Sequence, residues 1–188
     1  APAEQLKLRE FRRRVDAGSF PQYSSLAKAI RGMEFVQADP IRSPARAQDL
    51  ILRQRVDGYA AGDLEQKFPK LRAEEGYLFA YGFMTPQVWQ CLRHRPKLRL
   101  NGSERKVLES VAELGEAHPR VVNERFGRKS VRNAWGGSSQ AAKRILEKLH
   151  HHGHLRVVRR ENGIRVYQTP QDSGEKPAHP RERYRFLA

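Results

Sequence analysis

The pattern that most constrains the fold lies in the second half of the chain, where three amphipathic helices precede two short strands. The helices are expected over 103–114, 119–126 and 139–152, and the strands over 155–160 and 164–168. Ser103 is the predicted cap of the first helix, and Ser138 or Ser139 is expected to begin the third. Between the strands stands Asn162-Gly163, a dipeptide that favours the positive φ angles of a tight hairpin turn. Three helices followed by a hairpin predict a winged helix-turn-helix.

The first half predicts three shorter helices and one strand. The helices are expected over 4–16, 24–32 and 44–54, with a strand over 33–36. The first carries an apolar stripe of Leu6, Leu8, Phe11 and Val15 and is expected to end at Gly18. In the third, Ala47, Leu50 and Ile51 are expected to face the core. This order predicts a second unit resembling a helix-turn-helix.

The expected fold class is therefore mainly α with small β, built from tandem winged helix-turn-helix domains. A basic stretch around Pro96 reads as the linker between them. We expect an N-terminal domain over 1–95, a winged-helix domain over 96–170, and a mobile basic tail over 171–188, because that tail is rich in proline and charge.

The composition indicates a polyanionic partner. The chain has 188 residues and a formal net charge of +15, with 36 lysines and arginines against 21 acidic residues. Such a charge fits DNA, RNA or an anionic lipid surface. The single cysteine, Cys91, excludes an intrachain disulfide and a cysteine-cluster metal site. A reducing compartment, the cytoplasm and its nucleoid, is the expected location. We expect no cofactor, no membrane association and no obligate protein partner.

The candidate active site lies in the segment from Phe35 to Ile41, where Gln37 and Asp39 stand two residues apart. In an extended chain, such side chains point the same way. Pro40 favours an extended conformation at Asp39. An amide and a carboxylate at a strand end, beside a basic surface, predict a nucleic-acid active site. In the alternative interpretation, Asp39 merely caps the next helix.

Basic side chains of both halves are candidates for contact with a phosphate backbone. The candidate DNA-binding residues are Arg42, Arg46, Arg53, Lys143, Arg144, Arg156, Arg159, Arg160 and Arg165. In a winged helix the third helix enters the major groove and the hairpin contacts the backbone. For the arginines of the first half, a solvated helix face is an equal alternative.

Two clusters allow more than one interpretation. The aromatic residues between Tyr77 and Phe83 favour a core, with a surface for stacking or wedging bases as the alternative. The run from His150 to His154 invites a metal site, but adjacent helical histidines point in different directions. We therefore expect no metal, and favour a histidine-rich helix end instead.

Two separate signatures resemble one protein family. They are Val36-Gln37-Ala38-Asp39-Pro40-Ile41 with the segment 45–55, and the later segments 135–138, 143–146, 153–157, 159–160 and 165–167. In this order they resemble the bacterial winged-helix DNA glycosylases, the AlkZ-like enzymes. The resemblance implies a monofunctional enzyme that excises alkylated or crosslinked bases from double-stranded DNA by hydrolysing the N-glycosidic bond. It also implies that Gln37 positions a water that Asp39 activates.

The sequence departs from the family pattern in two places. The resemblance implies an aromatic-His-Glu element, but residues 79–84 contain neither His nor Glu. It also implies a third winged helix and a β-barrel, before which the sequence stops. The expectation is therefore a shortened member or a fragment of a longer protein. The alternative function is a winged-helix DNA-binding protein, a regulator or repair accessory, that has lost glycosylase activity.

Overall fold

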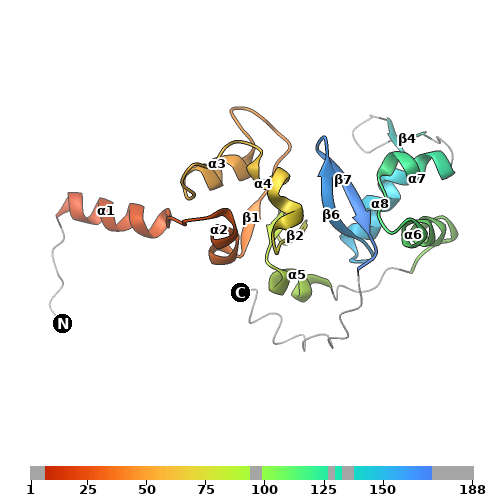
Figure 1. The fold of residues 1–188 in the computed structure, drawn as a ribbon, viewed down its shortest axis with the longest axis horizontal. Coiled ribbons are helices and arrows are strands. Elements are labelled where there is room, and N and C mark those ends of the chain that lie inside the picture. The colour runs from red at the N-terminus through yellow and green to blue at the C-terminus, as the bar shows by residue number, and fades with distance from the viewer. Residues whose placement is uncertain (1–6, 94–98, 127–129, 133–137, 171–188) are drawn as a thin grey trace.

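The computed structural model describes residues 7–93, 99–126, 130–132 and 138–170 (Figure 1). The α-helices are α1 (Leu8–Ser19), α2 (Leu26–Met33), α3 (Ala47–Arg53), α4 (Asp63–Lys67), α5 (Pro86–Arg93), α6 (Gly102–Leu114), α7 (Pro119–Phe126) and α8 (Ala141–His151). The strands are β1 (Phe35–Gln37), β2 (Glu74–Tyr77), β3 (Tyr81–Met84), β4 (Ser130–Arg132), β5 (Ser138–Gln140), β6 (Arg156–Glu161) and β7 (Ile164–Gln168). These elements confirm a mainly helical fold with small antiparallel sheets. None of the described helices is long and apolar enough to span a bilayer.

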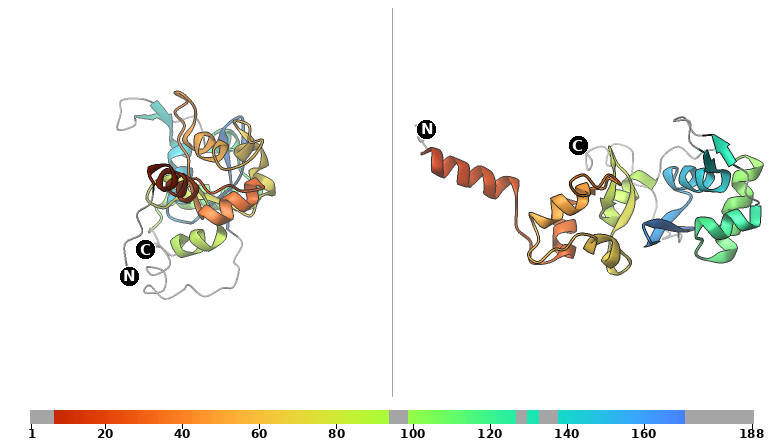
Figure 2. Two further views of the ribbon diagram at one scale, coloured as in Figure 1. Left: turned by 90° about the vertical axis from the view of Figure 1, so that its left-hand side faces the viewer. Right: turned by 90° about the horizontal axis from the view of Figure 1, so that it is seen from above.

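Helix α1 extends away from the rest of the molecule (Figures 1 and 2). The described part of its apolar stripe exists as predicted but is not buried: Leu8, Phe11 and Val15 are 63%, 53% and 46% exposed. Leu6 lies outside the described residues. The helix also continues through Gly18, where we expected it to end, as far as Ser19. The stripe therefore contributes nothing to the core of this chain.

Helix α2 is stabilised by a serine cap at its start and by a buried apolar face. The Ser25 hydroxyl accepts a hydrogen bond from the Lys28 N–H at 3.3 Å, and the apolar face carrying Leu26 and Ile30 is buried. The helix ends at Met33, one residue beyond the expected Gly32, and Glu34 is its C-cap with φ 59°. The chain then turns directly into β1, so that the predicted strand is confirmed with its bounds shifted by one or two residues.

A three-stranded antiparallel sheet, in the order β1-β3-β2, forms the centre of the first half. The sequence predicted only β1. In the central strand, a Cβ added to Gly82 would lie 2.4 Å from the Val36 carbonyl oxygen and 2.6 Å from the Phe35 ring. Glycine is therefore required where β1 pairs with β3. Of the aromatic cluster, Phe83 is buried as expected, whereas Phe79 at the hairpin tip is 80% exposed.

Helix α3 confirms only part of the predicted inward face: Ile51 packs against the core as expected, but Leu50 does not. Leu52 is fully buried, while Leu50 is 41% exposed. Two polar residues, Gln48 and Asp49, are buried beside Leu52. The Asp49 carboxylate accepts hydrogen bonds from the Tyr59 hydroxyl at 2.8 Å and from a backbone N–H of the following loop at 2.9 Å. The helix is therefore held by buried polar contacts as well as by apolar packing.

The second half contains the predicted order of three helices, α6, α7 and α8, followed by the β6–β7 hairpin. The turn residues Asn162 and Gly163 have φ 49° and 80°, as the dipeptide indicated. Two start positions were wrong. Helix α6 is capped by Asn101, through a capping box with Glu104, instead of by Ser103. Residues Ser138–Gln140 form strand β5, so that α8 begins only at Ala141.

The two halves share one core. Buried side chains of the first half, including Leu64 and Phe68, belong to the same apolar cluster as Leu149 and Val157 of the second half. Strand β2 lies beside β6 (Figure 1). The proposed linker around Pro96 and the expected tail over 171–188 lie outside the described residues.

Candidate functional site

Gln37 and Asp39 leave the sheet at the end of β1. Val36 is buried, with 1% of its surface exposed, and Gln37 on the opposite face is exposed opposite Gly82 of β3. The pairing continues for one more residue, because the Ala38 N–H donates to the Tyr81 carbonyl at 2.8 Å. Asp39 follows on this extended segment and is partly buried.

Two hydrogen bonds fix Asp39. Its backbone N–H donates to Oε1 of the buried Gln48 at 3.1 Å, which ties the motif to helix α3. Its Oδ1 accepts the Ile41 N–H at 2.7 Å, which closes a tight turn within the loop. Helix α3 begins only after Arg46, whose side chain makes no capping bond. Asp39 therefore does not cap the next helix, and the alternative interpretation of this residue is wrong.

A pocket of about 280 Å³ lies next to Asp39. It is lined by Ala38, Asp39, Pro40, Arg42, Arg46, Gln48, Glu65, Tyr81, Arg160, Gly163 and Arg165. The lining joins the motif loop, helices α3 and α4, strand β3 and the β6–β7 hairpin. Gln37 is not part of the lining, so that the pocket brings the candidate carboxylate, but not the candidate amide, together with the arginines.

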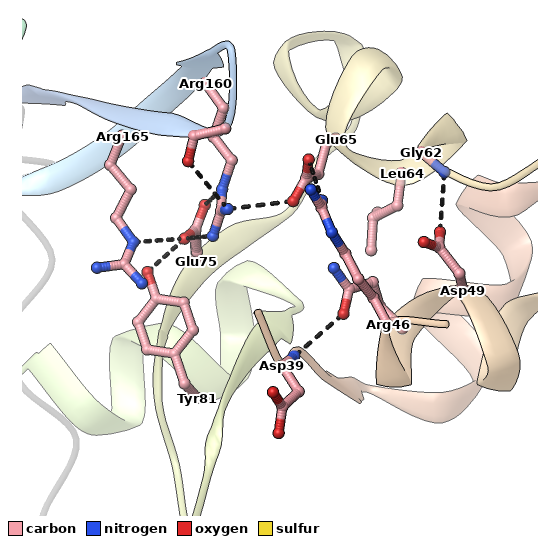
Figure 3. Close-up of polar contacts among 12 residues, drawn as sticks. Asp39, Arg46, Asp49, Gly62, Leu64, Glu65, Glu75, Tyr81, Arg160 and Arg165 are labelled. Atoms are coloured by element: carbon pink, nitrogen blue, oxygen red, sulfur yellow. Dashed lines mark hydrogen bonds and ion pairs between the residues drawn. The ribbon is translucent and has the colours of Figure 1, made fainter. Parts of the chain in front are cut away.

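Three of the four arginines that line this pocket, Arg46, Arg160 and Arg165, belong to a chain of ion pairs (Figure 3). Arg46 contacts Glu65 at 2.5 Å, and Glu65 contacts Arg160 at 3.1 Å. Arg160 also donates through both Nε and Nη2 to the carboxylate of Glu75, and its Nε lies 3.0 Å from Oε2. In Figure 3 the Asp39 carboxylate points away from these ion pairs. The chain of ion pairs thus connects the two halves of the protein without using Asp39.

Glu75 is the centre of this network. It is fully buried, and its Oε1 also accepts hydrogen bonds from Arg165 Nε at 3.0 Å and from the Tyr81 hydroxyl. Burial alone would raise the pKa of Glu75, but the hydrogen bond and charge of Arg160, with the charge of Arg165, lower it below its usual value. Burial and the charge of Glu75 raise the pKa of Tyr81. Glu75 is therefore held as a carboxylate, with Tyr81 neutral.

The guanidinium of Arg165 also lies 4.2 Å above the ring centroid of Tyr81. Arg156 pairs with Glu74 at 2.7 Å. Arg159 pairs with two more exposed carboxylates, at 2.9 and 2.6 Å. All four predicted arginines of the hairpin are thus engaged by carboxylates in this structure.

Three other predicted contact residues are available at the surface. Arg42, Arg53 and Lys143 are exposed, and their side chains have no hydrogen-bond or ion-pair partner among the residues that the structure describes. Lys143 stands beside a groove of about 430 Å³ that is lined by α7, the start of α8 and Ile164 of the hairpin. Arg144, its neighbour, is also exposed. Of these exposed residues, Arg42 lines the pocket beside Asp39, Arg53 is the last residue of α3, and Lys143 and Arg144 lie near the start of α8.

The aromatic residues at the hairpin tip divide between core and surface. The exposed Phe79 packs against Phe35, with ring centroids 4.9 Å apart, and Tyr77 is 43% exposed. Tyr77 contacts His151 edge-to-face at 5.2 Å. The cluster thus gives both a core residue, Phe83, and an exposed aromatic surface.

The histidine run is also divided. His150 is buried, and its Nε2 lies 2.8 Å from the Glu75 carbonyl oxygen. Burial lowers the pKa of His150 to about 4. Within the described residues, no group of three or more His, Cys, Asp or Glu side chains is arranged to hold a metal ion.

Sequence reasoning missed the residues that hold this site together, namely Gln48, Glu65, Glu75 and Tyr81. One feature of the sequence could have indicated a role for Glu75: a pair of acidic residues, Glu74-Glu75, precedes an aromatic segment in a strongly basic chain. Its partners stand 85 and 90 positions later in the sequence. No local pattern connects residues that far apart.

One comparison with known proteins identifies the family. The model of a family described as "DNA glycosylase AlkZ-like" matches residues 30–188. The chain belongs to the AlkZ-like DNA glycosylase family. The match begins within α2, so that α1 of this AlkZ-like protein lies outside it. No curated protein and no solved structure matches the chain.

Family membership gives the site its context. The matched region contains Gln37 and Asp39, the anchoring Gln48, and the network around Glu75. In this AlkZ-like chain the motif loop and the β6–β7 hairpin line the same pocket. The signature around Gln37 and Asp39 and the later signature, which includes Arg160 and Arg165, therefore lie close together in the fold although they are far apart in the sequence.

Proposed function

We propose that this protein binds double-stranded DNA and hydrolyses the N-glycosidic bond of an alkylated or crosslinked base. The observation that carries the proposal is the position of Asp39 in a chain that belongs to the AlkZ-like family. Asp39 is fixed by Gln48 at the end of β1, and Gln37 is exposed two residues before it. The exposed Gln37 amide and the partly buried Asp39 carboxylate, on one extended segment, can face a deoxyribose from the same side.

The proposed reaction needs only water. Gln37 orients a water molecule toward C1′ of the sugar, and Asp39 accepts a proton from it or offsets the positive charge that develops on the sugar. The oxygen of water forms a bond to C1′ while the C1′–N bond breaks, and the electron pair of that bond leaves with the base. Alkylation of a ring nitrogen makes the base cationic, so that it leaves as a neutral molecule.

We also propose that the fold consists of tandem winged helix-turn-helix domains, over 1–95 and 96–170. The order of α6, α7, α8 and the β6–β7 hairpin supports the second domain. Lys143 and Arg144 near the start of α8 would approach the major groove. Arg42 and Arg53 would contact phosphates near the motif. Arg46, Arg156, Arg159, Arg160 and Arg165 remain DNA-contact candidates, although each is paired with a carboxylate here.

The test is release of base from a duplex that carries 7-methylguanine or an alkyl interstrand crosslink. We expect the wild-type protein to release base, and Asp39→Asn to lower the rate at least about a hundredfold, the usual loss for a general base. Asp57→Asn is the matched control, because Asp57 is an exposed aspartate of the same half. Equal rates for wild type and Asp39→Asn would refute the catalytic role.

A second function is favoured by a different observation. The segment 79–84 contains neither the histidine nor the glutamate that the family resemblance implies. Its Phe83 is fully buried in the core, and its Tyr81 hydroxyl is bonded to Glu75. A winged-helix DNA-binding protein without glycosylase activity would have this appearance. Tight, salt-dependent binding to a particular DNA sequence without base release would support this function.

A further inference from the structure

Two packed aromatic rings, the exposed Phe79 and the partly buried Phe35, lie beside the candidate motif. Phe79, at the tip of the β2–β3 hairpin, is 80% exposed. Its ring packs against that of Phe35, with centroids 4.9 Å apart and ring planes inclined by 52°. A single exposed aromatic residue is common, but two packed together at a candidate site form a feature that needs an explanation. We call Phe35 and Phe79 the aromatic platform.

The sheet places this platform on the same side as Gln37. Phe35 and Gln37 are two residues apart on β1, and Val36 between them points into the core. The Phe35 ring lies against Gly82, the residue that is paired with Gln37 across the strands. The missing side chain at Gly82 thus makes room for the ring. The platform therefore shares a face of the sheet with Gln37, and Asp39 follows Gln37 two residues later along the chain.

We infer that the aromatic platform binds the damaged base after it has left the DNA stack. The inference rests on the proposed function and names the group that this face of the sheet recognises. Stacking of a base on an aromatic side chain contributes about 1–3 kcal/mol and requires only an exposed ring face. A base bound there would keep its sugar close to Gln37 and Asp39.

The two phenylalanine rings of the platform indicate that its ligand is a cationic base. A purine alkylated on a ring nitrogen is a cation, and the faces of phenylalanine rings attract cations. The platform therefore favours the cationic damaged base over the neutral normal base. Two rings are too small for a stable protein interface, which buries about 1,200 Å² or more. The net charge of +15 and the exposed Arg42 in the adjoining pocket favour a nucleic acid as the occupant.

The experiment measures binding, so that it does not depend on base release. The probe is a duplex with one 7-methylguanine on a 2′-fluorinated sugar, which resists hydrolysis, and the reference is the same duplex with unmethylated 2′-fluoroguanine. The readout is the ratio of the two dissociation constants. The variants are Phe79→Leu, which keeps the apolar surface but loses the aromatic face, and Phe79→Trp, which keeps that face. Phe11→Leu on the exposed helix α1 is the matched control.

We expect wild type, Phe79→Trp and Phe11→Leu to prefer the cationic duplex, and Phe79→Leu to reduce this preference by about tenfold. Phe79→Leu removes an exposed side chain, so that the variant is expected to fold. The inference is overturned if wild type shows no preference, or if Phe79→Leu keeps it. A preference that is lost in Phe79→Leu, in a protein that releases no base, supports the platform while refuting the proposed hydrolysis. If the wild-type protein releases base but Phe79→Leu keeps the preference for the cationic duplex, the proposed hydrolysis is supported and the platform is refuted.

Discussion

Arg160 on strand β6 donates two hydrogen bonds to the fully buried carboxylate of Glu75 on strand β2. The two residues stand 85 positions apart and belong to different halves of the chain. Arg165 contacts the same carboxylate at 3.0 Å. One buried acidic side chain thus offsets two guanidinium groups, and the β6–β7 hairpin is attached to the sheet of the first half through this charge.

Replacing Glu75 with glutamine is expected to destabilise the protein strongly. The change would remove the buried counter-charge that Arg160 and Arg165 share and leave Arg160 with Glu65 alone at 3.1 Å. Breaking a buried ion pair on one side costs about 3–5 kcal/mol. Urea unfolding at neutral pH, followed by circular dichroism, gives the free energy of unfolding. In the control Glu116→Gln, which loses a half-exposed pair with Arg159, the change should stay within about 1 kcal/mol. Similar losses for both variants would contradict the central role of Glu75.

The stability of the fold is expected to fall with acidity because of His150. Its pKa is about 4 in the fold, where burial disfavours the charged form, and about 6.5 in the unfolded chain. Its contribution is therefore complete above pH ~6.5 and is lost as the pH falls toward 4, on the order of 3 kcal/mol in total. Unfolding free energies measured across this range should show a shallower slope for His150→Gln. The partly exposed His152 serves as the control, and His152→Gln should keep the wild-type slope.

Gln48 is expected to act as a positioning residue for Asp39. Gln48→Leu removes the acceptor of the Asp39 N–H and so frees the motif loop from helix α3. Small displacements of a catalytic group can cost up to about a hundredfold in rate. In a single-turnover base-release assay, Gln48→Leu should therefore slow the reaction at least tenfold while DNA affinity stays near the wild-type value. Gln54→Leu, at the exposed end of the same helix, should change neither quantity. An unaltered rate in Gln48→Leu would exclude this role.

DNA binding is expected to depend on the exposed basic residues more than on the paired ones. Arg42→Ala and Lys143→Ala should each weaken binding and reduce the slope of log affinity against log salt concentration by about one. Arg159→Ala should have a smaller effect, because its guanidinium already lies between two carboxylates. Titrations of one duplex at several salt concentrations measure all three slopes. Equal slope changes would mean that the pairs of Arg159 open on DNA.

The elements that could be predicted from the sequence are those specified by local residues. Ser25 caps α2, and Asn162-Gly163 sets the hairpin turn. The candidate site was also located from a short segment, because the strand that was expected before Asp39 depends only on the residues around it. Each of these features depends on residues within a few positions of one another.

The elements that could not be predicted depend on distant partners. Strand β2 begins with Glu74-Glu75, a sequence typical of a surface, yet both residues are buried by contacts with arginines more than 80 positions away. For the same reason the ion pairs of the hairpin arginines could not be predicted, since an arginine paired with a distant carboxylate and one facing a phosphate look alike in sequence. Leu50 was expected to face the core but is 41% exposed, because α3 instead buries Leu52 together with the polar residues Gln48 and Asp49.

The backbone at Gly82 also limits how this chain can change over generations. A side chain there would collide with the Val36 carbonyl oxygen and the Phe35 ring. In the genetic code, every single-nucleotide change of a glycine codon that alters the amino acid introduces a Cβ. Every single-nucleotide substitution that replaces the residue at position 82 therefore introduces a clashing side chain. Descendants of this protein that keep Phe35 beside Gln37 must keep this glycine.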